Sequence, residues 1–221
     1  MNNVGSWVLR SLGTLVVLAS ILVGASVSSR AAPVTFAYEG VVSSSSGTSP
    51  VFATFLGQSM TVEYTFDSET PDSTPSSIFG AYNDTISSFT ATVGGYTATD
   101  LTVQIIVFDS GSVDQYIIGS NTITGPAIGG AVPTDFAFNF ENGSPSVFSS
   151  DELPIVQPDP SDFGTVFLEL NFFSPSGSFG SIRAENFSIV EAPSSISEPS
   201  ALAFLGVSAA VFAMRRRKRS G

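Results

Sequence analysis

Short runs in which apolar and polar residues alternate make up the middle of the chain, and this period of two restricts the fold to β structure. The pattern is clearest at Val34–Glu39, Met60–Phe66, Phe136–Phe140 and Val166–Phe172. In an extended strand successive side chains point to opposite faces, so alternation produces one apolar face and one polar face. No stretch in the middle has the period of a long amphipathic helix. We therefore expect half-buried antiparallel strands.

Turn-forming residues and changes of pattern divide these runs. Gly94-Gly95 predicts a two-residue hairpin, and Asp109-Ser110-Gly111 predicts a further turn. Leu101–Phe108 is apolar on both faces, which is typical of a central strand. In Ile182–Val190 the alternation changes phase near Asn186, which indicates a β-bulge. Loops are predicted at Ser43–Pro50, Ser68–Ser77, Gly125–Pro133 and Ser149–Asp162.

Seven to ten short strands in one domain predict an all-β fold, a single antiparallel β-sandwich or jelly-roll-like domain. The chain has no Cys, so no disulfide stabilises this domain. Phenylalanine supplies the core instead, because 17 of the 19 Phe residues lie between Ala32 and Ser197. Burying each ring would contribute roughly 2–3 kcal/mol.

Charge is distributed very unevenly along the sequence. Between Ala32 and Ser197 there are 18 acidic residues but only one basic residue, Arg183, which leaves a formal charge of −17. This excludes nucleic acid as a partner, since phosphate neutralisation needs many Lys and Arg side chains. The charge is typical of an exported protein that must stay soluble. Affinity for divalent cations or basic surfaces is the functional alternative.

Most catalytic chemistry is excluded by composition. Without His or Cys, neither a Ser-His-Asp nor a Cys-His unit can form. Lys218, the single lysine, lies in the C-terminal tail, which removes a Ser-Lys unit. Zinc sites of the usual nitrogen and sulfur type are also excluded. We predict no catalytic residue, no metal ligand and no cofactor, and expect that the protein is not an enzyme.

Three functional alternatives remain, each weaker than a purely structural interpretation. A carboxylate pair acting on a glycosidic bond would be drawn from residues on or beside strands, namely Glu63, Glu141, Glu169 and Glu185. Calcium could bind acidic residues in turns, namely Asp67, Glu69 and Asp72 in one loop and Asp159 and Asp162 in another. The same residues serve equally well as solvated turn caps.

Carbohydrate binding is the third alternative, and it usually requires exposed aromatic rings. The single Trp is residue 7, so the middle of the chain offers only tyrosines for stacking against a sugar. Tyr38 and Tyr64 occupy predicted core-facing positions. Tyr82, between Gly80 and Asp84, is the best candidate for a loop contact.

The first 31 residues have the features of a secretory signal peptide. Arg10 precedes an apolar stretch from Leu12 to Val27, and small residues follow. Cleavage after Ala31 places Ser29 at position −3 and alanine at −1. An uncleaved membrane anchor is the alternative, and in either case the residues that follow are exported.

The last residues combine a short apolar run with an abrupt basic end. Ser200 to Met214 is 15 uncharged residues, or about 22 Å as a helix at about 1.5 Å per residue. Since a bilayer core is about 30 Å thick, we predict a transmembrane helix that needs local thinning of the bilayer or snorkelling of its flanking arginines. A basic cluster then forms a cytoplasmic stop, made of Arg215, Arg216, Arg217, Lys218 and Arg219. A buried helix with a solvated basic tail is the alternative.

A short motif precedes this run, made of Ser197, Glu198, Pro199 and Ser200. The order of motif, apolar run and basic cluster resembles the PEP-CTERM sorting signal of Gram-negative bacteria that make exopolysaccharide. Ser197 stands where that family usually has its first proline. The resemblance implies processing by an exosortase, a membrane protease-transpeptidase, after signal peptidase has acted at the other end. It also suggests exopolysaccharide as a further partner.

The expected organisation is a signal peptide at 1–31, an acidic β-sandwich domain at 32–192, a linker at 193–196 and the sorting signal at 197–221. We expect a non-enzymatic protein of the cell surface or extracellular matrix, held transiently in the inner membrane by its C-terminal helix. The alternative is a carbohydrate- or calcium-dependent binding module on the same scaffold.

Overall fold

The structure is a computed structural model, and it describes residues 33–74 and 76–191. These residues form ten strands and two short 3₁₀ helices. The strands are β1 (Val34–Gly47), β2 (Ser59–Phe66), β3 (Phe79–Tyr82), β4 (Ile86–Val93), β5 (Tyr96–Asp100), β6 (Gln104–Asp109), β7 (Asp114–Ser120), β8 (Val132–Asn142), β9 (Thr165–Phe173) and β10 (Phe179–Ile189). The 3₁₀ helices are η1 (Pro50–Phe55) and η2 (Pro160–Asp162).

All ten strands belong to one continuous sheet in the order β3-β6-β7-β8-β9-β10-β1-β2-β4-β5. Every pair of neighbouring strands is antiparallel, so the prediction of antiparallel β structure is confirmed. The strands do not divide into two separate sheets, as a sandwich or jelly roll requires. The long strands β1 and β10 instead join the two halves, because each is long enough to belong to both.

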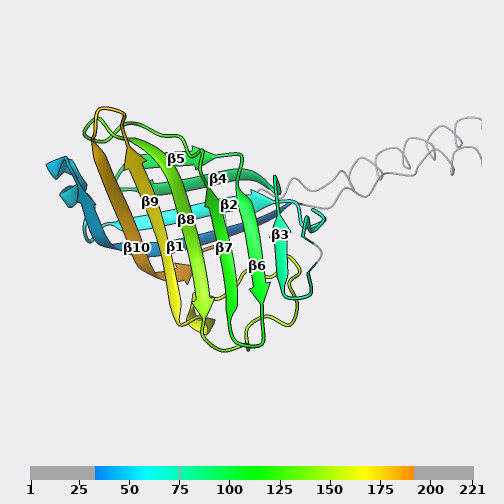
Figure 1. The fold of residues 1–221 in the computed structure, drawn as a ribbon. Coiled ribbons are helices and arrows are strands. Elements are labelled where there is room, and N and C mark those ends of the chain that lie inside the picture. Colours follow the sequence, from blue (N-terminus) through cyan, green and yellow to red (C-terminus); the bar gives the residue numbers. More distant parts are fainter. Residues whose placement is uncertain (1–32, 75, 192–221) are drawn as a thin grey trace, which may run out of the picture.

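The sheet curls over so that its two halves face each other. In Figure 1 the strands β9, β8, β7, β6 and β3 form one layer, and β1, β2, β4 and β5 cross behind it at a steep angle. Aromatic contacts between strands that are not neighbours connect the layers. The rings of Phe89 on β4 and Phe136 on β8 stack with centroids 3.9 Å apart, and the ring of Tyr38 on β1 meets that of Phe138 on β8 edge-on at 5.3 Å.

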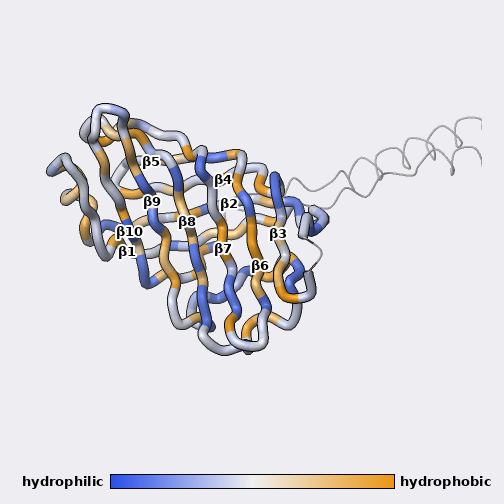
Figure 2. The backbone as a smooth tube through the Cα atoms, in the orientation of Figure 1, coloured by the Kyte–Doolittle hydropathy of each residue, from blue (hydrophilic) through white to orange (hydrophobic). Residues whose placement is uncertain are grey.

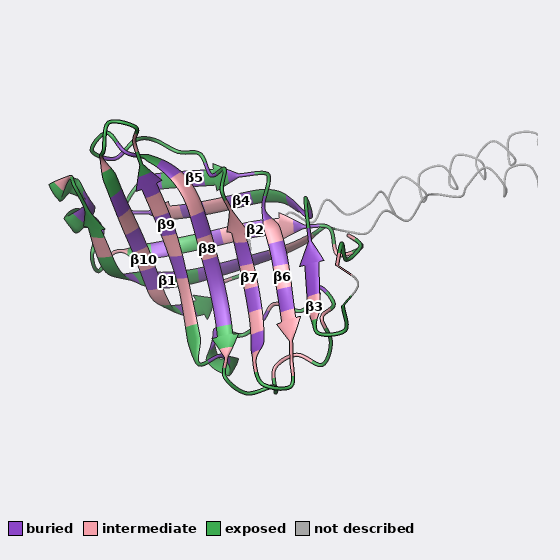
Figure 3. Cartoon of the chain, viewed as in Figure 1, coloured by how far each residue is buried: buried purple, intermediate pink, exposed green. Residues whose placement is uncertain are grey.

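The predicted alternation appears directly in the burial of the strands (Figure 3). In β2, for example, Met60, Val62, Tyr64 and Phe66 are buried while the residues between them are exposed or half-buried. In Figure 2 the strand β6 is instead hydrophobic along most of its length, which fits the apolar run from Ile105 to Phe108. The buried side chains form a single core between the two layers of the sheet. Its size explains how the domain can be stable without disulfides.

Two local predictions of backbone shape are confirmed. Gly94 and Gly95 join β4 to β5, with Val93 paired to Tyr96. Their φ angles of 54° and 81° lie in the left-handed region that such a tight hairpin demands. In β10 the register against β1 slips next to Asn186, whose φ is 56°. The predicted bulge is therefore present.

The predicted boundaries of two strands were wrong. The serine-rich stretch from Ser43, predicted as a loop, continues β1 to Gly47, because Ser44, Ser45 and Ser46 pair with β10. Ladder hydrogen bonds there outweigh the low strand preference of the serines. The central strand β6 starts only at Gln104, and Leu101 is 68% exposed. The strand β6 is nonetheless central, since it pairs with both β3 and β7.

Several predictions concern residues outside the part that the structure describes. These are the signal peptide with Ala31, the linker at 193–196, the sorting motif Ser197–Ser200, the apolar run and the basic cluster Arg215–Arg219. Within residues 33–74 and 76–191, no helix is long and apolar enough to cross a membrane.

The aromatic core should dominate the stability of the domain. Phe138 is fully buried and its ring contacts those of Tyr38, Phe140 and Phe187. We expect Phe138→Ala to lower the free energy of unfolding by about 3–5 kcal/mol, because it removes these contacts and leaves a cavity. The matched control is Phe173→Ala, since Phe173 is 53% exposed. Urea unfolding that shows equal losses for both variants would contradict this view of the core.

Candidate functional site

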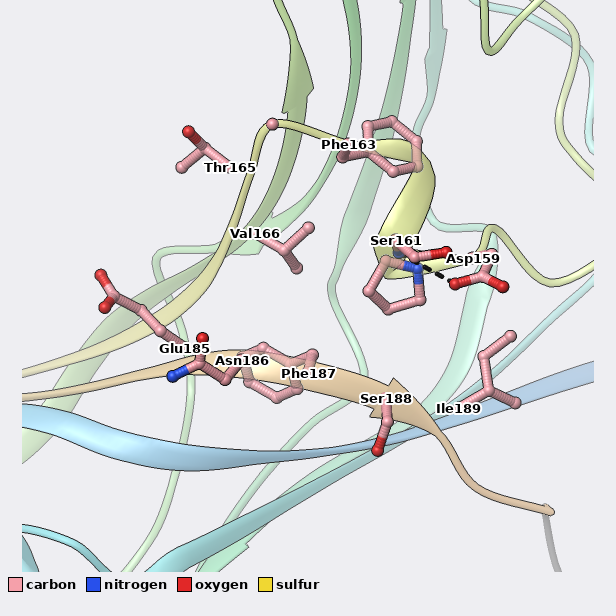
Figure 4. A pocket seen from close by; sticks show the side chains of 12 residues that line it. Asp159, Ser161, Phe163, Thr165, Val166, Glu185, Asn186, Phe187, Ser188 and Ile189 are labelled. Atoms are coloured by element: carbon pink, nitrogen blue, oxygen red, sulfur yellow. Dashed lines mark hydrogen bonds between the residues drawn. The ribbon is translucent and has the colours of Figure 1, made fainter.

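A cleft of about 620 Å³ lies beside the bulge of β10. One wall is the segment around η2, and the other is the end of β10 (Figure 4). Its polar lining consists of Asp159, Ser161, Thr165, Glu185, Asn186 and Ser188. Its apolar lining consists of Pro160, Phe163, Val166, Phe187 and Ile189.

The bulge shapes one wall of this cleft. Between the pairs Glu39–Ser188 and Val41–Glu185, a single residue of β1, Gly40, faces two residues of β10. A Cβ atom at Gly40 would lie 2.8 Å from the ring of Phe187, so only glycine lets that ring pack against β1. The bulge thereby shifts the alternation of β10 by one residue, which places the side chain of Asn186 at the cleft.

A capped turn shapes the opposite wall. The Oδ1 atom of Asp159 accepts a hydrogen bond of 2.9 Å from the backbone N–H of Ser161. Pro160 follows as the first residue of η2, where its missing N–H is not needed. The aspartate therefore starts the 3₁₀ turn and is presented to the cleft at the same time (Figure 4).

Both carboxylates of the cleft are held in their charged form. A hydrogen bond of 2.9 Å from Nε of Arg183 lowers the pKa of Glu185, and Ser43 adds to the effect. The backbone N–H of Ser161 lowers the pKa of Asp159. A glycosidase needs one carboxyl that is protonated at working pH. With both groups ionised, the cleft is suited to accept hydrogen bonds from a ligand rather than to donate a proton.

Arg183 on β10 lies between the acidic side chains of Glu169 and Glu185. Its guanidinium carbon lies 3.8 Å from the centroid of the Phe167 ring, and Nη1 lies 3.8 Å from Oε2 of Glu169. Glu169 and Glu185 thus share one cation across neighbouring strands. Because these side chains are about one-third exposed, the cluster stabilises the domain only modestly.

Of the four glutamates considered for hydrolysis, only Glu169 and Glu185 come together, and only Glu185 lines the cleft. Glu169 and Glu185 are paired with Arg183. Glu63 lines a smaller hollow of about 330 Å³ on β2, and Glu141 is exposed near the end of β8. Among the described residues, these four do not form a pair that faces across the cleft.

The residues considered for calcium serve backbone turns. Asp67 accepts a hydrogen bond from the N–H of Glu69, and Asp72 accepts bonds of 2.8 Å from the N–H groups of Thr74 and Ala81. Within the described ranges, no three acidic residues are grouped so that they could hold a metal ion. These geometries match the turn-cap interpretation.

The five tyrosines are all buried, which confirms the core positions of Tyr38 and Tyr64. The prediction that Tyr82 offers a loop contact was wrong, because only 5% of its surface is exposed. Its hydroxyl donates a hydrogen bond of 2.7 Å to the carbonyl of Asp151, and burial raises its pKa to about 12. The exposed rings on the sheet are instead Phe173 and Phe179, which pair across β9 and β10.

Sequence analysis also missed a pair of aspartates at the hairpin between β6 and β7. Asp109 and Asp114 face each other in register, and Asp114 is fully buried. The Oδ2 atom of Asp114 accepts hydrogen bonds from the N–H groups of Val147 and Phe148, while Oδ1 is buried without a partner. Acidic residues at both ends of the Ser110-Gly111 turn were the only available signal, and such residues are common in turns.

Comparison with known protein families, curated proteins and solved structures gives no match to this chain.

The aspartate pair should make stability depend on pH. Desolvation, followed by the charges of Asp114 and Asp151, raises the pKa of Asp109. A carboxyl with a raised pKa contributes stability that is complete below its unfolded pKa and is lost as pH rises through the folded pKa. Asp109→Asn cannot ionise, so we expect it to be more stable than the wild type at pH 7, with the difference shrinking towards pH 3.

Thermal unfolding of both proteins across this pH range would measure the difference. The exposed residue Glu152 provides the control Glu152→Gln. A difference for Asp109→Asn that stays constant between pH 3 and pH 7 would show that ionisation of Asp109 is not its cause.

Proposed function

We propose that the chain is an exported, non-enzymatic protein of the cell surface or extracellular matrix. A signal peptide directs its export, and the C-terminal sorting signal holds it in the inner membrane until an exosortase processes it. The setting is the envelope of a Gram-negative bacterium that makes exopolysaccharide. The acidic β domain is the part that remains outside.

The observation that supports this most is the position of the two ends of the domain. The start of β1 lies beside the end of β10, with Tyr38 paired to Ile189 and the N–H of Val190 bonded to the carbonyl of Ala37. A domain placed between two membrane-directed segments must lead both of them to one membrane surface. Neighbouring ends satisfy this requirement without strain in the fold.

The chemistry of the described residues agrees with a non-enzymatic role. The sequence lacks His and Cys, and both carboxylates at the cleft are held ionised. The acidic surface keeps an exported domain soluble. The aromatic core supplies stability that many small exported domains obtain from disulfides.

A second candidate function is ligand binding at the cleft beside β10. Its lining of hydroxyl, amide and carboxylate groups next to Phe163 and Phe187 suits a neutral, hydroxyl-rich ligand such as a polysaccharide segment. The experiment is affinity electrophoresis in gels containing the exopolysaccharide of the host. Thr165→Val should weaken retardation several-fold if it removes one hydrogen bond of about 1 kcal/mol. Thr97→Val on the distant strand β5 is the control, and absence of any retardation would eliminate this candidate.

Processing at both ends can be measured by intact-mass analysis of the protein recovered from its host. We expect the loss of residues 1–31 and a second cut near Glu198-Pro199. Replacing Glu198 and Pro199 with alanine should abolish the second cut and leave the first unchanged, because only the sorting motif is altered. Ser195→Ala, in the predicted linker, is the control. A wild-type protein that keeps its C-terminal tail at full mass would contradict the proposal.

A further inference from the structure

The end of the domain where β1 starts and β10 finishes, residues 34–38 and 187–191, is here called the terminal pole. The loop between β8 and β9 is fixed to this pole by two hydrogen bonds. Nε2 of Gln157 donates to the carbonyl of Ala37 at 2.5 Å, and the hydroxyl of Tyr38 donates to the carbonyl of Pro158 at 3.0 Å. Ala37 also accepts the N–H of Val190. The loop and the end of β10 therefore meet at one backbone carbonyl.

The residues just before Gln157 form an apolar bend that projects into solvent. Ile155 and Val156 are 68% and 78% exposed, and Val156 is the most exposed large hydrophobic residue in the described part of the chain. The bend is supported on both sides, because Leu153 and Pro158 are buried. Two adjacent aliphatic side chains are thus held outward by a fixed loop. Isolated exposed hydrophobic residues are ordinary, but an anchored pair next to both chain ends suggests a contact surface.

The length of chain beyond the described residues limits what can cover this bend. Nine residues, 192–200, separate Glu191 from the start of the apolar run at Ala201. At about 3.3–3.6 Å per residue, these nine residues span at most about 32 Å. If the apolar run is in a bilayer, as the proposed function requires, the terminal pole stays within this distance of the lipid surface. Such a tether gives an effective concentration on the order of millimolar, so weak contacts are sufficient for docking.

We propose that Ile155 and Val156 dock on the lipid surface and orient the tethered domain with its terminal pole towards the membrane. This inference rests on the proposed function, because the tether brings the bend to the bilayer. The neighbouring acidic residues Glu152 and Asp159 are exposed, so their hydration limits the contact to the headgroup region. Docking directs the far end of β1, with η1, away from the lipid (Figure 1).

The absence of cysteine makes this testable with single labels. Full-length protein carrying Val156→Cys would be labelled with an environment-sensitive fluorophore and reconstituted into phosphatidylcholine vesicles that contain a lipid with a shallow nitroxide quencher. We expect the label at 156 to lose roughly half of its fluorescence, as for a side chain at the headgroup boundary. The matched control is Leu56→Cys, since Leu56 is 59% exposed and follows η1 at the opposite end of β1. Its fluorescence should not change.

A third label separates this proposal from the proposed function. Leu205 belongs to the apolar run. The fluorescence of a label on Leu205→Cys should be quenched by a nitroxide placed deep in the bilayer if the run enters it. Quenching at 205 but not at 156 would overturn docking and leave the anchor intact. No quenching at 205 would overturn the anchor and, with it, the basis for docking. A third outcome would also overturn docking: the label at 156 is protected from an aqueous quencher and is not quenched by the nitroxide lipid. Another segment or a second copy of the chain would then cover the bend.

Discussion

Pairing between the first strand and the last is the interaction on which the rest of the structure depends. The ladder of β1 and β10 joins the two layers of the sheet into one, from Tyr38–Ile189 at one end to Gly47–Gly180 at the other. It contains the bulge that shapes the cleft, and it brings the two ends of the domain together. Without this ladder the sheet would end in two more open edges, each with unpaired backbone groups.

Aromatic packing then fixes how the two layers face each other. Phe89 and Phe136 stack across the interior, and the hydroxyl of Tyr64 donates to that of Tyr116 at 3.2 Å. Burial raises the pKa of both of these tyrosines well above its usual value. These two hydroxyls therefore stay protonated near neutral pH, and their hydrogen bond joins the two layers without a buried charge.

Alternation and turn residues were sufficient to predict β2, β9 and parts of β1 and β8, together with the Gly94-Gly95 hairpin and the bulge at Asn186. These features depend on neighbours in sequence, whereas β3 and β7 carried no such signal. The continuous sheet was not predictable in this way, since it depends on which distant strands pair. The serines of β1 had no strand preference of their own and became ordered through β10. The cleft was missed for the same reason, since η2 and the end of β10 come together only in the folded chain. Asp109 and Asp114 are neighbours in a hairpin, but the burial of Asp114 depends on Val147 and Phe148, which are distant in sequence.

The β1–β10 ladder also determines when the sheet can be completed, because it joins the first strand to the last. Loop closure between residues 38 and 189 comes at a high entropic cost, and contacts of such long sequence separation form slowly. A chain that crosses a membrane from its N-terminus delivers β1 first and β10 last. The sheet is therefore completed only when residues 179–189 are available to pair with β1. If the chain is exported as proposed, the sheet is completed last at the ladder next to the proposed membrane-directed segment.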